Sequence, residues 1–153
     1  MKVSDLMKKE VYTVGPDDMV DRIFFLIHYE KIRHIPVVDR GAVVGIVSDR
    51  DLYKAIGPRS RNRAVEKDES QLVVVPRKAR HIMKRGVITI EPGDDAARAA
   101  TIMGKRRIGA LPVVSKGKLV GIITATDILL AFAKIEAAAS KAREQVKAGA
   151  SAP

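Results

Sequence analysis

The chain has 153 residues, which is enough for one ordinary domain with a hydrophobic core or for two small repeats that share one. Its composition, 46% hydrophobic and 30% charged, is typical of a folded protein and excludes a disordered chain. The absence of cysteine excludes disulfides and zinc–thiolate sites. Because no signal peptide and no apolar run of membrane-spanning length is visible, we expect a cytoplasmic protein with no membrane partner.

The net charge of +10 favours anionic partners, which include nucleic acids, acidic membrane surfaces, proteins and phosphorylated small molecules. Much of this charge is local, since residues 57–85 carry nine Lys or Arg against three Asp or Glu. A solvated, ion-paired surface suited to high temperature accounts equally well for the charge. Net charge alone therefore leaves the class of partner open.

The first half of the chain predicts five elements in order. A β-branched strand over 10–14 ends before a proline, and a capped helix follows over 18–31. Two short apolar segments, 34–39 and 42–48, are joined by a tight Asp-Arg-Gly-Ala turn, which predicts an antiparallel hairpin. A helix over 49–56 completes the unit.

The second half repeats this pattern. Shifting the sequence by 76 residues aligns 7–54 with 83–130 without a gap, and 16 of the 48 aligned pairs are identical. The equivalent elements are strands over 86–90, 110–115 and 119–124 and helices over 94–106 and 125–148. The sequence therefore predicts an α/β (α+β) protein made of two β-α-β-β-α units.

We expect four segments along the chain: repeat 1 over 1–56, a basic linker over 57–78, repeat 2 over 79–135 and a helical extension over 136–153. Leu-Val-Val-Val in the linker is compatible with an extra strand over 72–75. The last helix is rich in alanine and has no breaker before Gly149, so we expect it to be long. Its apolar positions could cover the repeat core or a second subunit, and we expect both in sequence, with the distal part frayed or docked.

Each repeat places a hydroxyl residue and an acid three positions apart where a strand passes into a helix. Ser48 and Asp51 occupy these positions in repeat 1, and Thr124 and Asp127 occupy them in repeat 2. A helix N-cap with an acid in the first turn explains the pattern without any ligand. Alternatively, free amides and the hydroxyl could bind an anion while the carboxylate accepts hydrogen bonds from a diol. A phosphate together with a diol indicates a ribonucleotide.

The hairpin supplies a second group of candidate residues. Arg33 and His34 precede a buried strand in repeat 1, where a pair of basic side chains suits phosphate. A solvated strand end is the alternative explanation. Repeat 2 has the uncharged Gly109 and Ala110 at the equivalent positions, and Arg50 is likewise replaced by Thr126. The two copies are chemically unequal.

These motifs together resemble a tandem cystathionine-β-synthase (CBS) domain pair, also called a Bateman module. The resemblance covers about 1–135 and rests on three motifs that each occur twice in register. They are the T-h-x-P opening at Thr13-Pro16 and Thr89-Pro92, the h-P-V-V strands at 35–38 and 111–114, and the G-h-h-S/T-x-x-D signatures at 45–51 and 121–127.

The resemblance implies two repeats packed through their sheets about a pseudo-twofold axis, with two clefts that bind AMP, ADP, ATP or S-adenosylmethionine. Each cleft is expected to combine residues of both repeats. One would contain Thr124 and Asp127 with Val11, Tyr12, Thr13, Arg33, His34, Ile35 and Pro36. The other would contain Ser48, Arg50 and Asp51 with Val87, Ile88, Thr89, Gly109, Ala110 and Pro112.

The resemblance also implies roles for these residues. Asp51 or Asp127 would accept hydrogen bonds from the ribose, while Ser48 or Thr124 and the helix amides would hold phosphate. Aliphatic residues and proline would enclose the adenine, and the basic residues would neutralise phosphate charge. Gly109 and Ala110 would remove the basic pair from the Ser48 cleft and leave Arg50 as its main cation. We expect a regulatory ligand sensor, homodimeric and coupled to an effector protein.

Other function classes have weaker support. An enzyme is not indicated, because the histidines 28, 34 and 81 form no metal or acid–base pattern, and Asp49 and Asp51 point apart on a helix. The basic runs 59–63 and 76–80 are compatible with nucleic-acid binding but have no interleaved aromatic residues. A purely structural, dimerising adaptor is the third alternative.

Overall fold

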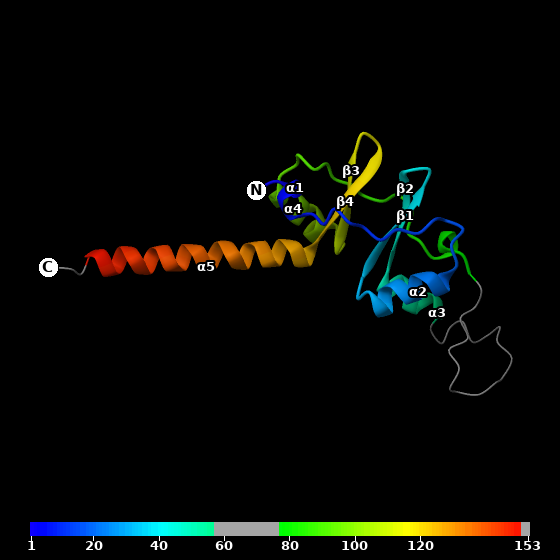
Figure 1. The fold of residues 1–153 in the computed structure, drawn as a ribbon, viewed down its shortest axis with the longest axis horizontal. Coiled ribbons are helices and arrows are strands. Elements are labelled where there is room, and N and C mark those ends of the chain that lie inside the picture. The colour runs from blue at the N-terminus through cyan, green and yellow to red at the C-terminus, as the bar shows by residue number, and fades with distance from the viewer. Residues whose placement is uncertain (57–76, 151–153) are drawn as a thin grey trace, which may run out of the picture.

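The computed structural model describes residues 1–56 and 77–150, which form two short antiparallel sheets surrounded by helices (Figure 1). The elements in chain order are α1 (Val3–Leu6), α2 (Val20–Tyr29), β1 (His34–Asp39), β2 (Ala42–Ser48), α3 (Asp49–Ile56), the 3-10 turn η2 (Ala79–His81), α4 (Ala96–Arg106), β3 (Ala110–Ser115), β4 (Lys118–Thr124) and α5 (Ala125–Ala150). The predicted mixed α/β fold with a duplicated unit is confirmed. The expected strand over 72–75 lies outside the described residues.

The two hairpins have the same register and the same turn. His34 pairs with Ser48 at the open end of the β1–β2 hairpin, and Ala110 pairs with Thr124 at the open end of the β3–β4 hairpin. Both turns place a basic residue and a glycine at positive φ, which is the geometry that twists two strands together. Ser48 and Thr124 are the last residues of β2 and β4, so each hydroxyl residue lies immediately before the helix that follows.

The strands predicted over 10–14 and 86–90 are wrong, because each segment forms only a single parallel bridge. Val14 bridges Val37, and its N–H donates to the carbonyl of Pro36 at 3.2 Å. Extending this parallel ladder would require N–H donors from Pro36 on one side and Pro16 on the other, and proline has none. Ile90 bridges Val113 between Pro92 and Pro112 in the same way.

Two of the predicted helices begin later than expected. Asp18 uses Oδ2 to accept a hydrogen bond from the Gly15 N–H at 2.7 Å, and Asp94 accepts one from the Glu91 N–H at 3.0 Å. Each acid therefore stabilises a turn that precedes its helix, so α2 and α4 begin two residues downstream of 18 and 94.

The segments that precede the two repeats are exchanged between them. Residues 3–7 pack in the core of repeat 2, where Val3 is completely buried, and residues 79–83 pack in the core of repeat 1, where Ala79 is completely buried. The exchange continues along the backbone, because Lys8 shares two hydrogen bonds with Ile122 of β4, and Lys84 shares two with Ile46 of β2. Neither core is complete without chain from the other repeat.

Each exchanged segment places a methionine over a glycine of the opposite sheet. A Cβ added to Gly121 would lie 2.7 Å from Sδ of Met7 and 2.9 Å from the Lys8 carbonyl oxygen. Gly45 faces Met83 in the same way. The glycine that opens each G-h-h-S/T-x-x-D signature is therefore required for this close approach.

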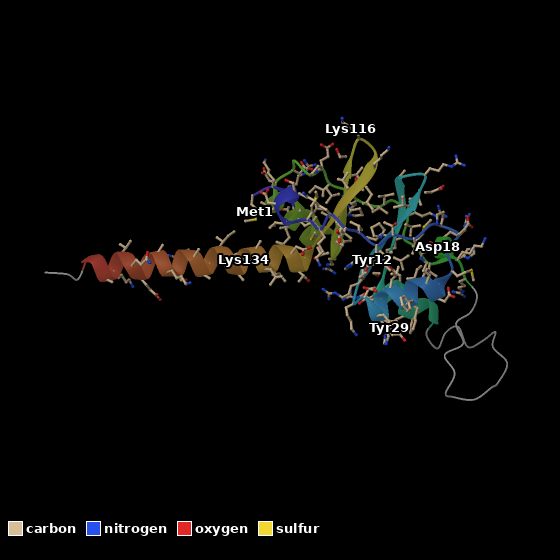
Figure 2. The ribbon with its side chains drawn as sticks, viewed as in Figure 1. Met1, Tyr12, Asp18, Tyr29, Lys116 and Lys134 are labelled. Carbon is tan, nitrogen blue, oxygen red and sulfur yellow. The ribbon has the colours of Figure 1, made fainter. Side chains whose placement is uncertain are left out.

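Helix α5 begins on repeat 2 and then leaves the rest of the chain. Ala131 is buried and Ile128 packs against the core of repeat 2, whereas Phe132 and Ile135 are more than half exposed. Figure 1 shows the distal part of α5 pointing away from both sheets, and Lys134 lies on this part in Figure 2. No helix in the described part of the chain combines the length and the hydropathy needed to cross a bilayer.

We predict that Gly121→Ala lowers the free energy of unfolding by about 1–3 kcal/mol, since the new methyl group overlaps both a side chain and a backbone carbonyl. Gly104→Ala is the matched control, because nothing lies within 4 Å of the added atom in α4 and a helical Gly→Ala change stabilises by about 0.5–1 kcal/mol. Chemical denaturation measures both variants. An unchanged stability of Gly121→Ala would contradict the exchanged packing.

Candidate ligand-binding cleft between the repeats

The two hydroxyl–acid pairs form closed reciprocal caps at the starts of α3 and α5. Oδ2 of Asp51 accepts hydrogen bonds from the Ser48 hydroxyl at 2.6 Å and from the Ser48 N–H at 2.9 Å. The Asp51 N–H donates back to the Ser48 hydroxyl at 3.3 Å. Thr124 and Asp127 repeat this arrangement, with 2.6 Å for the hydroxyl, 2.8 Å for the Thr124 N–H and 3.3 Å for the bond back from the Asp127 N–H. The capping interpretation of these residues therefore holds in both repeats.

This capping changes what the helix start of α3 offers to a ligand. The Asp49 N–H donates to the Arg33 carbonyl at 3.1 Å, and the Arg50 N–H donates to Oδ1 of Asp49 at 2.8 Å. With the Asp51 N–H bound to Ser48, the first three amides of α3 already have partners. The expectation of free helix amides for phosphate is wrong here, and the carboxylates are not unpaired. Oδ1 of Asp51, the His34 ring and the nearby basic side chains remain for a ligand.

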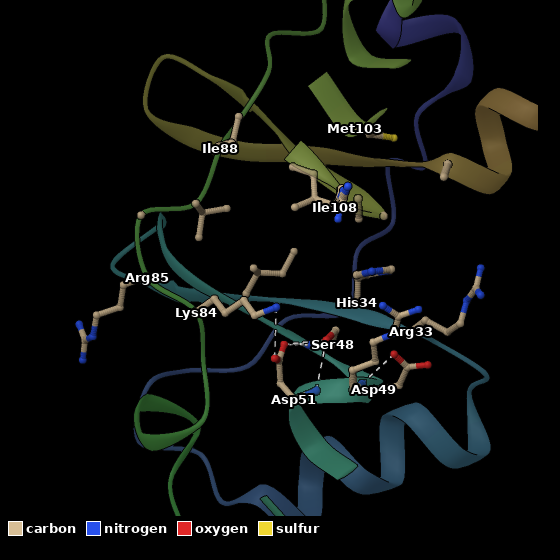
Figure 3. Close-up of a pocket in the computed structure, with 18 of the residues that line it drawn as sticks. Arg33, His34, Ser48, Asp49, Asp51, Lys84, Arg85, Ile88, Met103 and Ile108 are labelled. Carbon is tan, nitrogen blue, oxygen red and sulfur yellow. Dashed lines mark hydrogen bonds and ion pairs between the residues drawn. The ribbon is translucent and has the colours of Figure 1, made fainter. Parts of the chain in front are cut away.

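A cleft of about 600 Å³ lies between the open end of the β1–β2 hairpin and repeat 2 (Figure 3). Its walls come from both repeats, with Ser48 and Asp51 on one side and Met103 and Ile108 on the other. Its remaining lining residues are Arg33, His34, Ile46, Asp49, Arg50, Lys84, Arg85, Gly86, Val87, Ile88, Gly104, Arg107, Gly109, Ala110 and Ala125. A volume of this size is typical of small-molecule sites.

The charged groups around the cleft give it a positive balance. Five of its lining residues are Lys or Arg, and two are Asp. Nζ of Lys84 lies 3.3 Å from Oδ1 of Asp51 and points toward it, whereas the Arg85 side chain points away from Asp51 (Figure 3). Arg33, Arg50 and Arg107 are left as cations without an acidic ion-pair partner among the described residues. The cleft therefore favours an anion.

Asp51 is the buried acid of this cleft, with 8% of its surface exposed. Burial pushes the pKa of Asp51 upward, but the hydrogen bonds from Ser48 and the charge of Lys84 outweigh it, so the pKa lies below its ordinary value. The carboxylate is therefore ionised at neutral pH. It can accept hydrogen bonds from ligand hydroxyls through Oδ1 if Lys84 shares that atom.

His34 occupies the space that Gly109 leaves free. A Cβ on Gly109 would lie 2.9 Å from Cε1 and 3.0 Å from Nε2 of the His34 ring. The imidazole of repeat 1 thus lies against the backbone of repeat 2, inside the Ser48 cleft. Burial is the main cause that lowers the pKa of His34, with Arg33 and Lys84 acting in the same direction against Asp49 and Asp51. The neutral ring is favoured, so His34 offers a ligand ring nitrogens for hydrogen bonding and carries no full charge.

The structure adds to one expectation drawn from the resemblance. Arg33 and His34, expected beside Thr124 and Asp127, also line the Ser48 cleft, and their role at the Thr124 site stays a prediction. The Ser48 cleft contains basic residues although Gly109 and Ala110 are uncharged, because repeat 1 contributes Arg33. The missing Cβ of Gly109 leaves space for the His34 ring. Arg33 also reaches the other repeat, where its Nη2 donates to Oγ1 of Thr126 at 3.1 Å.

The structure brings most of the expected Ser48 set together. Ser48, Arg50, Asp51, Val87, Ile88, Gly109 and Ala110 all line the cleft. Thr89 is exposed outside this lining, and Pro112 is almost fully buried in β3. Pro112 therefore offers a ligand no side-chain surface in this conformation.

The expected Thr124 set is more dispersed. Ile35 and Pro36 are buried in β1, and Val11 and Thr13 are half-buried. Tyr12 is half exposed, and its hydroxyl donates to Oε2 of Glu30 at 3.2 Å. Thr124 and Asp127 are bound to each other as a cap, so their role toward a ligand stays a prediction.

Sequence reasoning missed three basic residues of the cleft, Lys84, Arg85 and Arg107. Lys84 follows Met83 on the exchanged segment, and the recurrence of Met7-Lys8 as Met83-Lys84 in the repeat alignment was the available signal. Arg107 ends α4 with φ at 54°, in the left-handed region. Nothing in the local sequence marks Arg107 as a cleft residue, since its position depends on how repeat 2 packs against repeat 1.

Two basic residues of the run 76–80 form ion pairs within the folded structure. Lys78 and Arg80 both form ion pairs with Asp17, at 3.1 and 2.6 Å. The other basic run, 59–63, lies outside the described residues. Within residues 1–56 and 77–150, no group of three or more potential metal ligands is found.

Comparison with known proteins identifies the family. The CBS domain model matches residues 3–58 and 79–134, so the chain belongs to the CBS domain family and carries two copies of the domain. A CBS domain-containing protein of Dictyostelium discoideum is 32% identical over 139 residues, covering 87% of this chain and 92% of that protein.

Solved CBS domain pairs share the fold. The CBS domain pair of protein MJ0100, solved in complex with 5′-methylthioadenosine and S-adenosyl-L-methionine, has a TM-score of 0.72 and 27% identity, covering 88% of this chain and 97% of that one. CBSX2, solved in complex with AMP, has a TM-score of 0.70 and 26% identity, covering 88% and 98%.

Other curated relatives are longer than this chain. The chain spans 47% of a relative from Methanocaldococcus jannaschii and 23% of a homoserine O-acetyltransferase from Methanococcoides burtonii. CBS domain pairs of this length are therefore also found as parts of larger proteins.

We predict that His34 makes the stability of the chain pH-dependent. Because the folded pKa of His34 is below its ordinary value of 6.5, the unfolded state binds more protons as the pH falls. Wild-type stability should therefore fall from pH 7.5 toward pH 5.5, and should fall less in His34→Gln, which does not titrate. Urea denaturation of both proteins at several pH values measures this difference. Parallel curves would show that His34 is not desolvated in the cleft.

Proposed function

We propose that the chain is a non-catalytic regulatory module that binds adenine nucleotides in the cleft between its two CBS repeats. The observation that carries this proposal is a cleft of about 600 Å³ that combines a buried carboxylate, an apolar wall and several cations from both repeats. The two solved CBS domain pairs with bound AMP or adenosine derivatives support the class of ligand. S-adenosylmethionine is an alternative ligand of the same class.

The three parts of the cleft match the three parts of a nucleotide. Val87, Ile88, Met103 and Ile108 form the apolar wall that would enclose the adenine. Asp51 is ionised and would accept hydrogen bonds from the ribose through Oδ1. Arg33, Arg50 and Arg107 would hold the phosphates, because the amides of α3 already have partners.

A ligand in this cleft would touch both repeats and the chain that follows the exchanged segment 79–83. Binding would therefore favour the arrangement in which the repeats are closed against each other, by the difference in affinity between that state and any other. This is the behaviour of a sensor that reports a ligand to an effector protein. The larger relatives that include such a pair within an enzyme are compatible with a regulatory role.

We predict that Arg107→Ala weakens AMP binding by about ten- to a hundredfold, the effect of losing one charge-assisted hydrogen bond. Lys31→Ala is the matched control: Lys31 is the repeat equivalent of Arg107, carries the same charge, and also adopts a left-handed backbone, with φ at 56°. Lys31 does not line the cleft. Isothermal titration calorimetry at fixed ionic strength measures both affinities.

Two results would contradict the proposal. An equal loss in both variants would mean that general charge, and not the cleft, determines AMP binding. If Arg107→Ala binds AMP as tightly as the wild type, Arg107 does not hold the phosphate.

We predict a ligand order from a thermal-shift panel of adenosine, AMP, ADP, ATP and S-adenosylmethionine. A ligand that binds only the folded state raises the midpoint, by about 2.7 kcal/mol of stabilisation at a hundredfold excess over Kd. Because the cleft is rich in cations, AMP, ADP and ATP should each raise the midpoint more than adenosine does. Inorganic triphosphate alone is the control for simple charge binding. No shift with any adenosine compound would refute the proposed function.

A further inference from the structure

Helix α5 carries an apolar stripe that has no partner in the structure beyond its first turns. Phe132, Ile135 and Val146 are 61%, 51% and 72% exposed. Together with Ala139 and Ala142 they follow one another at alternating spacings of four and three residues. This is the repeat that aligns side chains along one side of a helix and forms the seam of a coiled coil.

The stripe continues the face by which α5 packs on its own repeat. Ile128 packs against the core of repeat 2 and Ala131 is buried, after which the helix leaves the rest of the chain (Figure 1). At about 1.5 Å per residue, the part from 132 to 149 extends for roughly 27 Å. In proteins most of the stability of a helix comes from the packing of its apolar face, and the apolar side chains of this part are exposed. The stripe therefore requires a partner surface.

We propose that this partner is the α5 helix of a second copy of the chain, lying antiparallel. The charges that flank the stripe support this arrangement. Glu136 and Arg143 lie on the same edge of the stripe, seven residues apart, and both are exposed. In an antiparallel pair, equivalent edges face each other, so Glu136 lies opposite Arg143 of the partner subunit. The twofold axis repeats this contact, which gives two complementary pairs.

The sizes of the side chains fit the same register. Ile135 meets Val146 of the partner subunit, and the central layers pair Ala139 with Ala142 of the partner subunit. Phe132, the largest side chain of the stripe, meets Gly149 of the partner subunit. Small residues in the centre allow the two helices to approach closely, while the larger contacts lie toward both ends.

A parallel pair lacks these matches. It would place Phe132 against Phe132 of the partner subunit, and Glu136 and Arg143 would each face an alanine, at positions 131 and 138. The antiparallel pair holds the two CBS bodies at opposite ends of the joined helices. The dimer contact is then remote from the cleft, so this inference does not depend on the proposed function.

Charge reversal tests the pairing by sedimentation equilibrium of the full chain. Glu136→Arg and Arg143→Glu should each raise the dimer dissociation constant about tenfold, since each replaces two attractive pairs with two repulsive ones. The double variant should restore the wild-type constant. Glu144→Arg is the matched control, with the same charge change on the opposite face of α5, and should leave the constant unchanged. A monomeric wild type, or single reversals without effect, would overturn the proposal.

Cysteine cross-linking tests the direction of the helices, because the natural chain has no cysteine. Under mild oxidation, a mixture of Ile135→Cys and Val146→Cys chains should form a mixed disulfide dimer. Neither variant should cross-link alone, because identical positions are about 16 Å apart along the antiparallel pair and disulfides require Cα atoms within about 7 Å. Cross-linking of each variant alone would indicate parallel helices and overturn the proposal.

Discussion

The exchange of the two leading segments is the constraint on which the other features of this chain depend. Val3 closes the core of repeat 2 and Ala79 closes the core of repeat 1, and both are completely buried. A repeat without the segment from its neighbour would expose apolar core surface to water, at a cost of roughly 25 cal/mol for each Å². The two repeats are therefore stable as a pair, with a fixed relative position.

The location of the cleft follows from this exchange. The segment that places Met83 over Gly45 continues directly into Lys84, whose ammonium group reaches Asp51. The same segment then leads into Val87 and Ile88, which line the apolar part of the cleft. Chain that belongs to repeat 2 in sequence thus forms a wall of the polar site of repeat 1. A ligand held there contacts groups whose relative position depends on the pairing of the repeats.

Local sequence predicted the hairpins and the capped starts of α3 and α5 well, because their determinants lie within a few residues. The apolar segments 34–39 and 110–115 and the turns that follow them specify each hairpin without help from distant residues. The strands over 10–14 and 86–90 failed because their pairing depends on a proline in a neighbouring strand. The exchange of segments and the place of Arg107 join residues far apart in the sequence, and no local pattern reports such contacts.

The two repeats share the same backbone scaffold but differ in the polar side chains that they place at the cleft. Both repeats retain the cap and the glycine beneath the methionine, so both hairpins fold in the same way. At the cleft, repeat 2 has Gly109 where repeat 1 has Arg33, and the imidazole of His34 fits against Gly109 because no Cβ is present. A side chain at position 109 would collide with the ring of His34. The loss of side chains in one copy is therefore what allows the other copy to supply the polar groups of a shared site.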